Sequence, residues 1–294
     1  MLLKFLRRAV FLAAGGFLAY LFWLPDVGSL RTTNPQTTAL RELRAEEARR
    51  SGKKPVSRMI WRDLPQISGN LVHAVLLAED DRFYQHSGFD VEQIQVALQR
   101  DWAQKRFVYG GSTITQQLAR TLYLSPRKNL IRKMKEAVIT VILERTLSKK
   151  RILELYLNVV EWGRGIYGAE AAARFYFGAS ADDLTPDEAV ALASILPSPR
   201  RWSPWSEKNF MARRRTQLFE RMRAAGYVPY EVLVDTASED GDGLDAEPAG
   251  EPASEQNAEG LFITEHPAPA PPFSPDSVIP DSSAESLPPQ QPAD

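Results

Sequence analysis

The sequence predicts an all-α domain that lies between an N-terminal apolar segment and an acidic C-terminal tail. From about Trp61 to Tyr230 the apolar residues recur with helical periodicity, strand-like alternation is scarce, and the breaks fall at glycine and proline. Residues 9–24 carry no charge, and residues after 235 are rich in proline and poor in large apolar side chains. These observations divide the chain into a transmembrane anchor, a connector, a folded domain and a disordered, acidic, proline-rich tail, over residues 1–26, 27–54, 55–230 and 231–294.

The N-terminal apolar run extends from Ala9 to Leu24, after Lys4, Arg7 and Arg8. At about 1.5 Å per residue it spans roughly 24 Å, so flanking residues must extend the helix for it to cross a bilayer. A cleaved signal peptide is the alternative, but no convincing small-residue cleavage site follows the run. The run therefore predicts an uncleaved anchor whose basic flank keeps the N-terminus in the cytoplasm and places the rest of the chain outside it.

The connector is polar and charged, with a short exposed helix expected over Leu40–Arg50. In the folded domain, periodic segments between glycine and proline breaks predict helices. The segment after Asn129 has an apolar stripe that includes Ile131 and Met134 and is expected to be buried, and Leu153 and Leu157 are core candidates in the next segment. The predicted helices cover residues 69–82, 90–104, 112–123, 129–147, 149–160, 167–176, 186–196 and 207–225.

The net charge of −1 conceals a strong asymmetry. All 36 lysines and arginines precede residue 224, together with 22 acidic residues, which leaves a surplus of 14 positive charges; the remainder holds 15 acidic residues and no basic one. The positive charge of residues 1–223 predicts an anionic partner, and nucleic acid, anionic lipid and pyrophosphate all fit this pattern. The absence of cysteine excludes disulfides and thiol chemistry.

Acidic residues end the first predicted helix of the domain, in the run Glu79, Asp80 and Asp81. Negative charge at a helix C-terminus opposes the helix dipole, so this placement suggests a function, although a solvated acidic surface is the alternative. His86 lies close enough in sequence to hydrogen bond to these acids, and a structural role is the preferred interpretation for it.

A glycine turn precedes the helix that begins near Thr113, in the segment Gly110–Gln117. Thr113 and Gln116 have the spacing of a capping box, and a helix start after a glycine turn presents N–H groups and hydroxyls to phosphate oxygens. An ordinary helix start is the alternative, but Arg106 just before the turn favours an anion. The mixture of aromatic and basic residues at 100–109 fits a membrane interface or the edge of a core.

Two further clusters follow. Arg132, Lys133 and Glu136 have helical spacing and can share one face, either as a surface salt-bridge ladder or as a functional group. A carboxylate among cations is a poor general acid but can orient the cations. In the next segment, Glu154 and Asn158 are one turn apart and are expected to brace neighbouring loops.

Taken in order, these motifs resemble those of the monofunctional biosynthetic peptidoglycan glycosyltransferases, family 51 of the glycosyltransferases. The resemblance covers about Pro55–Arg223 and shows no departure at the motif positions. It rests on Glu79-Asp80 with Phe83, His86, Gly88 and Asp90; on Gly110–Gln117; on Arg132-Lys133 with Glu136; and on Lys149, Ile152-Leu153-Glu154 and Tyr156-Leu157-Asn158.

This resemblance implies a lysozyme-like helical fold in the periplasm, anchored by a single span in a bacterial inner membrane. It implies polymerisation of lipid II into β-1,4-linked glycan strands, with inversion at the anomeric carbon and release of undecaprenyl diphosphate. Glu79 matches the catalytic base and Glu136 the second functional glutamate. Substrate-binding candidates are Arg106, Ser112, Thr113, Gln116, Gln117, Arg132, Lys133 and Lys149, and supporting candidates are Asp80, Phe83, His86, Glu154 and Asn158.

The expected partners are lipid II, the growing strand, the membrane and other cell-wall synthesis or division proteins, and not nucleic acid. No metal-ligand spacing compels a cofactor, although Mg²⁺ or Mn²⁺ at the pyrophosphate fits the family. Two other functions are considered: a lysozyme-like enzyme that cleaves glycan, and a non-catalytic cell-wall scaffold. The basic clusters and the glycine turn, which suit a pyrophosphate, favour the polymerase.

Overall fold

The computed structural model describes residues 25–104, 111–125 and 129–228, together with isolated positions between Lys4 and Tyr20. The predicted tail from residue 231, Arg106 and Gly110 lie outside the described residues, as does most of the predicted anchor. Among the described residues, no helix is both long and apolar enough to cross a membrane. The chain divides into a unit over Met1–Asp235 and a second unit, Thr236–Asp294, which lies outside the described residues.

The described part is mostly helical, and each predicted helix of the domain is present within a few residues of its expected bounds. The α-helices are α2 (Ala39–Arg50), α3 (Gly69–Glu79), α4 (Val91–Gln104), α5 (Ile114–Tyr123), α6 (Leu130–Thr146), α7 (Lys149–Val159), α8 (Ala169–Phe177), α9 (Pro186–Ile195) and α10 (Asn209–Ala224). Three short 3-10 helices are η1 (Gly28–Arg31), η2 (Leu64–Gln66) and η3 (Phe83–Gln85).

A small sheet departs from the all-α prediction. Its strands are β1 (Arg58–Met59), β2 (Glu161–Gly163) and β3 (Ile166–Tyr167), in the order β1-β3-β2. Gly165, in the turn between β2 and β3, has φ +74°, and a Cβ there would lie 2.6 Å from the carbonyl oxygen of Val56. Glycine thus permits the tight turn and the close approach of the β1 segment. Strands of two or three residues are too short to show alternation in the sequence.

Side-chain caps explain where the helices begin. Thr113 accepts a hydrogen bond from the N–H of Gln116, and the side chain of Gln116 accepts one from the N–H of Thr113, which confirms the capping box predicted for α5. Thr185 and Glu188 form a second capping box at α9. Ser148 and Asn129 cap α7 and α6. Each cap satisfies an N–H group that the helix cannot pair internally.

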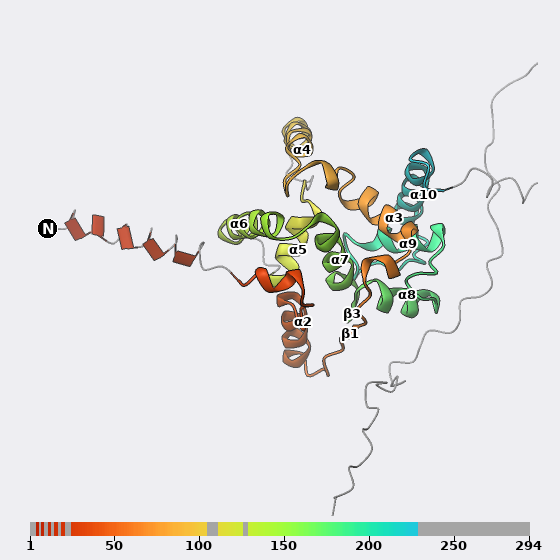
Figure 1. Ribbon diagram of the computed structural model, residues 1–294, viewed down its shortest axis with the longest axis horizontal. Coiled ribbons are helices and arrows are strands. Elements are labelled where there is room, and N and C mark those ends of the chain that lie inside the picture. Colours follow the sequence, from red (N-terminus) through yellow and green to blue (C-terminus); the bar gives the residue numbers. More distant parts are fainter. Residues whose placement is uncertain are drawn as a thin grey trace, which may run out of the picture. The chain divides into compact units, whose positions relative to one another are not determined.

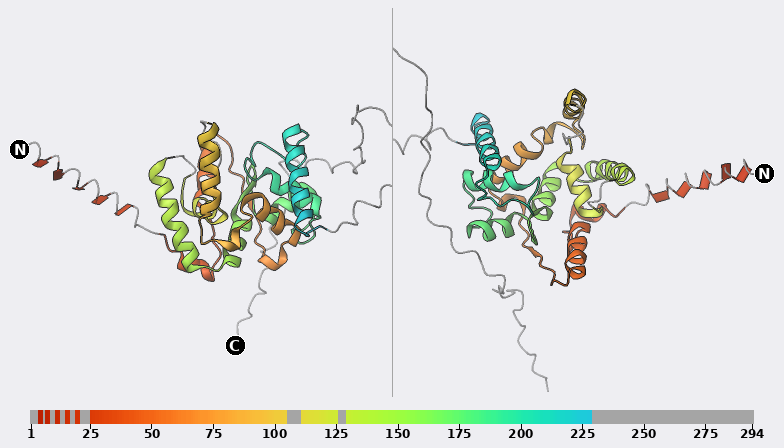
Figure 2. Two further views of the ribbon diagram at one scale, coloured as in Figure 1. Left: turned by 90° about the horizontal axis from the view of Figure 1, so that it is seen from above. Right: turned by 180° about the vertical axis from the view of Figure 1, so that it is seen from behind.

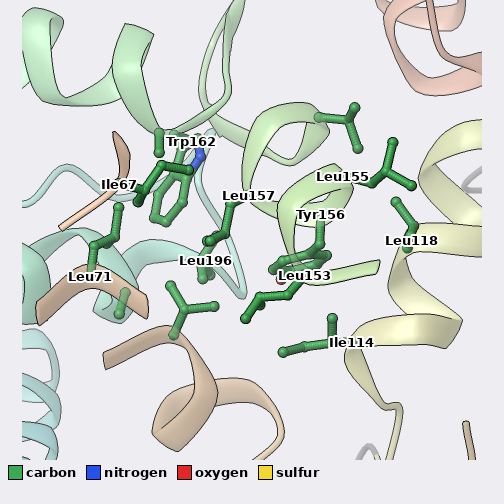
Figure 3. Close-up of a cluster of buried hydrophobic side chains, with 14 of the residues drawn as sticks. Ile67, Leu71, Ile114, Leu118, Leu153, Leu155, Tyr156, Leu157, Trp162 and Leu196 are labelled. Carbon is green, nitrogen blue, oxygen red and sulfur yellow. The ribbon is translucent and has the colours of Figure 1, made fainter. Parts of the chain in front are cut away.

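Helix α7 lies at the centre of the core. Figure 3 shows Leu153, Leu155, Tyr156 and Leu157 on this helix with neighbours from other elements, and all four are at most 1% exposed. In Figure 1, α7 lies between α5 and α6 on one side and α8 on the other, and it packs against all three. Because α7 is buried on most sides, the helices around it are fixed relative to one another.

Helices α3, α9 and α10 form a second packed group, in which each contacts the other two. All three views place α10 and α6 at opposite ends of the folded part (Figures 1 and 2). The C-terminus of α3 and the N-terminus of α5 meet between these ends, where the backbone N–H of Ile114 donates to the Asp80 carboxylate. The first two predicted motifs are therefore brought together by the fold.

Candidate active site

Asp80 joins the first two motifs. Its carboxylate is 3% exposed and accepts hydrogen bonds from the backbone N–H of Ile114 (2.9 Å) and from Nε2 of His86 (2.8 Å). Nδ1 of His86 accepts from the N–H of Gly88 (3.1 Å), so the ring proton lies on Nε2 and points to Asp80. Burial raises the pKa of Asp80, and these hydrogen bonds oppose the rise. The hydrogen bond from His86 to an acid of this run, which the sequence suggests, is present.

Glu79 ends α3 and turns its side chain toward α5 and α10. Its Oε2 accepts a hydrogen bond from Nε2 of Gln117 (2.9 Å), whose own Oε1 accepts from the hydroxyl of Tyr156 (3.2 Å). Nη2 of Arg214 lies 3.8 Å from Oε1 of Glu79. The Glu79 side chain is 11% exposed, and burial raises its pKa, opposed mainly by Gln117, Arg214 and Arg120. Such a carboxylate holds a proton more readily than an ordinary glutamate.

A cavity of about 580 Å³ opens beside Glu79. It lies between the C-terminus of α3, one face of α4 and α10, with Gly111 on its wall. Asp81 contributes to the lining and is held by Arg221 (3.0 Å) and Gln93 (2.9 Å). All three acids contribute to the cavity lining, but their environments differ: Glu79 contacts Gln117 and Arg214, Asp80 is buried as a brace, and Asp81 forms surface contacts.

Thr113 and Gln116 shape the turn before α5. Both are buried, and the Thr113 hydroxyl donates to the carbonyl of Gly88 (2.7 Å) while the amide of Gln116 completes the capping box. Gly88 itself has φ +92°, and a Cβ there would lie 2.8 Å from Cγ2 of Thr140. The side chains of Thr113 and Gln116 thus hold the segments together, whereas Ser112 and Gly111 are partly exposed.

Glu136 is fully buried and surrounded by cations. One carboxylate oxygen is hydrogen bonded to Nζ of Lys133, and the other lies 2.5 Å from Nη1 of Arg132 and 4.0 Å from Nη1 of Arg120. Lys133 and Arg120 remain 42% and 34% exposed. Solvent therefore does not reach the Glu136 carboxylate, whereas two of its cations face solvent.

Ser112 connects the surroundings of the two glutamates. Its carbonyl accepts from Nε2 of Gln117 (3.5 Å), which also binds Glu79, and its hydroxyl accepts from Nζ of Lys133 (3.3 Å), which also binds Glu136. Glu79 and the cations around Glu136 therefore belong to one continuous polar site that is arranged around the start of α5. Arg120, one helical turn beyond Gln117, electrostatically affects Glu79 as well.

Lys149 lies in a neighbouring cluster around Glu144, which no sequence motif indicated. Its Nζ donates to Oε1 of Glu144 (2.8 Å) and lies 4.3 Å from the ring centroid of Phe83. Thr115 donates to the same glutamate oxygen (2.5 Å). Lys149 thus pairs with Glu144, whereas Arg132 and Lys133 pair with Glu136. The Lys149 side chain is 22% exposed.

Glu154 and Asn158 brace the segment before α3, as predicted. Glu154 accepts from the N–H of Leu64 (3.0 Å) and pairs with Arg151. Asn158 accepts from the N–H of Arg62 (2.8 Å) and donates to its carbonyl (2.7 Å). Of the predicted site, only Arg106 lies outside the described residues.

Arg120, Arg214 and Glu144 are the site residues that sequence reasoning missed. Helical spacing places Arg120 on the same face as Gln116 and Gln117, which was a usable signal. Arg214 comes from α10, far along the chain, and only the packing of α10 against α3 and α9 brings it to the site. The described residues contain no group of three or more histidine, aspartate or glutamate side chains that could hold a metal ion.

Comparison with known proteins identifies similar sequences over most of the folded part. A family model described as "Transglycosylase" matches residues 47–223. A "Biosynthetic peptidoglycan transglycosylase" of Azoarcus sp. (strain BH72) is 49% identical over 202 residues, which cover 68% of this chain and 87% of that protein. Proteins with the same description from Aromatoleum aromaticum and Thiobacillus denitrificans are 51% identical over 177 residues and 42% identical over 227 residues. These alignments cover 60% and 77% of this chain, and 75% and 97% of the relatives.

Proposed function

The chain belongs to the transglycosylase family and is a peptidoglycan glycosyltransferase, and we propose that it extends glycan strands by direct displacement, with Glu79 as the base. The acceptor is lipid II, whose sugar 4-hydroxyl attacks the anomeric carbon of the growing strand. The bond between that carbon and the lipid diphosphate breaks as the β-1,4 bond forms, so the carbon is inverted. The hydroxyl proton passes to Glu79, and undecaprenyl diphosphate leaves.

The position of Glu79 carries this proposal. Oε2 is held by Gln117, whereas Oε1 has Arg214 at 3.8 Å, beyond hydrogen-bond range. The side chain lines a cavity of about 580 Å³, which is within the range of binding sites for small ligands. Burial raises the pKa of Glu79. A carboxylate with a raised pKa accepts a proton from a hydroxyl more readily than an ordinary glutamate does.

The cations around Glu136 are suited to the departing diphosphate. Arg120 and Lys133 are partly exposed, whereas Arg132 is mostly buried and its buried Nε has no hydrogen-bond partner among the described residues. Glu136 fixes their positions without competing for the substrate, because it is fully buried. Preorganised positive charge of this kind stabilises negative charge that develops on a leaving group. Ser112 supplies a hydroxyl beside Lys133.

The membrane location is also part of the proposal. Leu130, Ile131 and Met134 are large apolar residues that are 77%, 50% and 42% exposed on α6, so the prediction that Ile131 and Met134 are buried is wrong. Lys135 on the same helix donates to the carbonyl of Tyr20 and lies 4.0 Å from its ring centroid. An apolar helix face beside the N-terminal segment supports docking on the inner membrane, with the segment as a single-pass anchor and the site in the periplasm.

Cleavage of finished glycan is the rival reaction, because a buried glutamate in a helical fold can also act as a general acid. The three cations on Glu136 favour transfer, since hydrolysis of a glycosidic bond releases no diphosphate. Incubation of the purified full-length protein with lipid II and, separately, with isolated sacculi distinguishes them. Polymer growth from lipid II supports the proposal, and release of fragments from sacculi without polymer growth contradicts it.

A further inference from the structure

Arg214 contacts the proposed base from an element that none of the sequence motifs includes. It lies on α10, and its Nη2 is 3.8 Å from Oε1 of Glu79. At this distance the two groups form an ion pair without a hydrogen bond, so the lone pairs of Oε1 stay available for a proton. Gln117 occupies the other oxygen. The two oxygens of Glu79 therefore have different partners, and Oε1 is the one that is free to react.

The fold, and not Glu79, fixes the guanidinium of Arg214. Its Nε donates to the carbonyl of Ser194 (3.0 Å), which is 1% exposed in the last turn of α9. α10 packs against both α9 and α3, so the helix that carries Arg214 is docked on the helix that ends at Glu79. A charge held in this way needs no reorganisation during the reaction.

Three charged groups among the described residues act on Glu79. Arg214 faces it from α10, Arg120 acts on it from α5, and Asp80 follows it in the chain. Tyr156 on α7 is close enough to interact, but burial raises the pKa of its hydroxyl well above the ordinary value, so it stays uncharged. Burial raises the pKa of Glu79 and Asp80 adds to this effect, so the two arginines are the charges that oppose it.

We infer that Arg214 is a positioning residue that keeps Glu79 ionised in the resting enzyme, so that the carboxylate can accept the proton of the attacking hydroxyl. The inference rests on the proposed role of Glu79. A cation within about 4–6 Å of a carboxyl lowers its pKa by roughly 1–3 units. Because 30% of the Arg214 side chain is exposed, solvent screens part of this attraction.

The test is the pH dependence of polymerisation for Arg214→Gln, measured as initial rates with lipid II and the full-length protein in detergent. Loss of the cation should move the acid limb of the profile up by about 1 pH unit, with about tenfold less activity well below the limb and recovery above it. Arg214→Lys keeps the charge and should keep the limb close to that of the wild type. Arg213→Gln, at an exposed position on the same helix, should leave the whole profile unchanged.

The outcomes separate this inference from the proposed function. A rate for Arg214→Gln that falls equally at all pH values, or that does not change, overturns the inference. If Arg214→Gln does not fold, Arg214→Lys decides: an unshifted limb supports the inference, and a uniform loss overturns it. Glu79→Gln is measured in parallel, because retained activity there removes Glu79 as the base, whereas an inactive Glu79→Gln with an unshifted Arg214→Gln refutes only the role of Arg214.

Discussion

Glu136→Gln should destabilise the protein strongly, because the buried carboxylate neutralises Arg132, which is itself mostly buried. The side chain is fully buried, and its oxygens bind Arg132, which is 12% exposed, and Lys133, which is 42% exposed. Leaving a buried charge without its partner costs about 3–5 kcal/mol, and the Arg132 pair falls in this class. Solvent screens Lys133, so its pair adds at most about 1 kcal/mol. Glutamine keeps the shape but turns an N–H₂ group toward a cation.

We therefore expect a loss of about 3–5 kcal/mol in the free energy of unfolding. For a domain of this size, 1 kcal/mol corresponds to about 2–4 °C, so the melting temperature should fall by roughly 6–20 °C. Thermal unfolding of the full-length protein in detergent, followed by circular dichroism, measures this. Glu46→Gln is the matched control, because its ion pairs with Arg49 and Arg50 lie on the exposed face of α2 and its loss should barely change the melting temperature. An unchanged melting temperature for Glu136→Gln would show that Arg132 does not need the Glu136 charge for stability.

Three other variants test separate parts of the structure. Lys133→Ala should lower kcat/KM for lipid II by about tenfold or more, since an exposed cation beside Ser112 is lost; unaltered steady-state kinetics would remove it from the diphosphate site. Arg62, Arg174 and the N–H of Ala181 lower the pKa of buried Glu170 to about 2, so its stabilisation is present above about pH 4.5 and disappears as the pH falls toward 2. Glu170→Gln should remove on the order of 2 kcal/mol of that pH-dependent stability in acid titrations followed by circular dichroism, and a titration curve identical to the wild type would contradict this. Gly88→Ala should lower the melting temperature, because φ is +92° and the new Cβ meets Thr140, and a variant as stable as the wild type would show that the turn relaxes freely.

Much of the fold could be read from the sequence because local signals and tertiary packing agree there. The capping box of Thr113 and Gln116, the apolar surfaces of α7 and the bracing roles of Glu154 and Asn158 all follow from spacing along one helix. The β-strands were missed because each spans only two or three residues. Their pairing depends on the turn at Gly165, which only the folded chain reveals.

The sequence predicted the motif residues of the candidate site, but not how deeply they are buried or which charged residues they contact. Spacing brought Glu136 together with Arg132 and Lys133, but it could not show that the glutamate is fully buried. Arg214 is more than a hundred residues from Glu79 in sequence, and no local pattern links them. Lys149 was grouped with the other cations through the resemblance to the family motif, whereas the fold pairs it with Glu144. Charge partners set by tertiary packing are not available from periodicity.

The most direct test of the mechanism is the rate of glycan polymerisation by Glu79→Gln, with purified full-length protein, lipid II and a thermal unfolding curve of the same sample. Glutamine can keep the contact with Gln117, so the fold should be retained, while a positioned base contributes about 10²–10⁴-fold to a rate. We expect a folded protein whose polymerisation rate falls by at least about 100-fold. A folded variant that polymerises lipid II at close to the wild-type rate would contradict it.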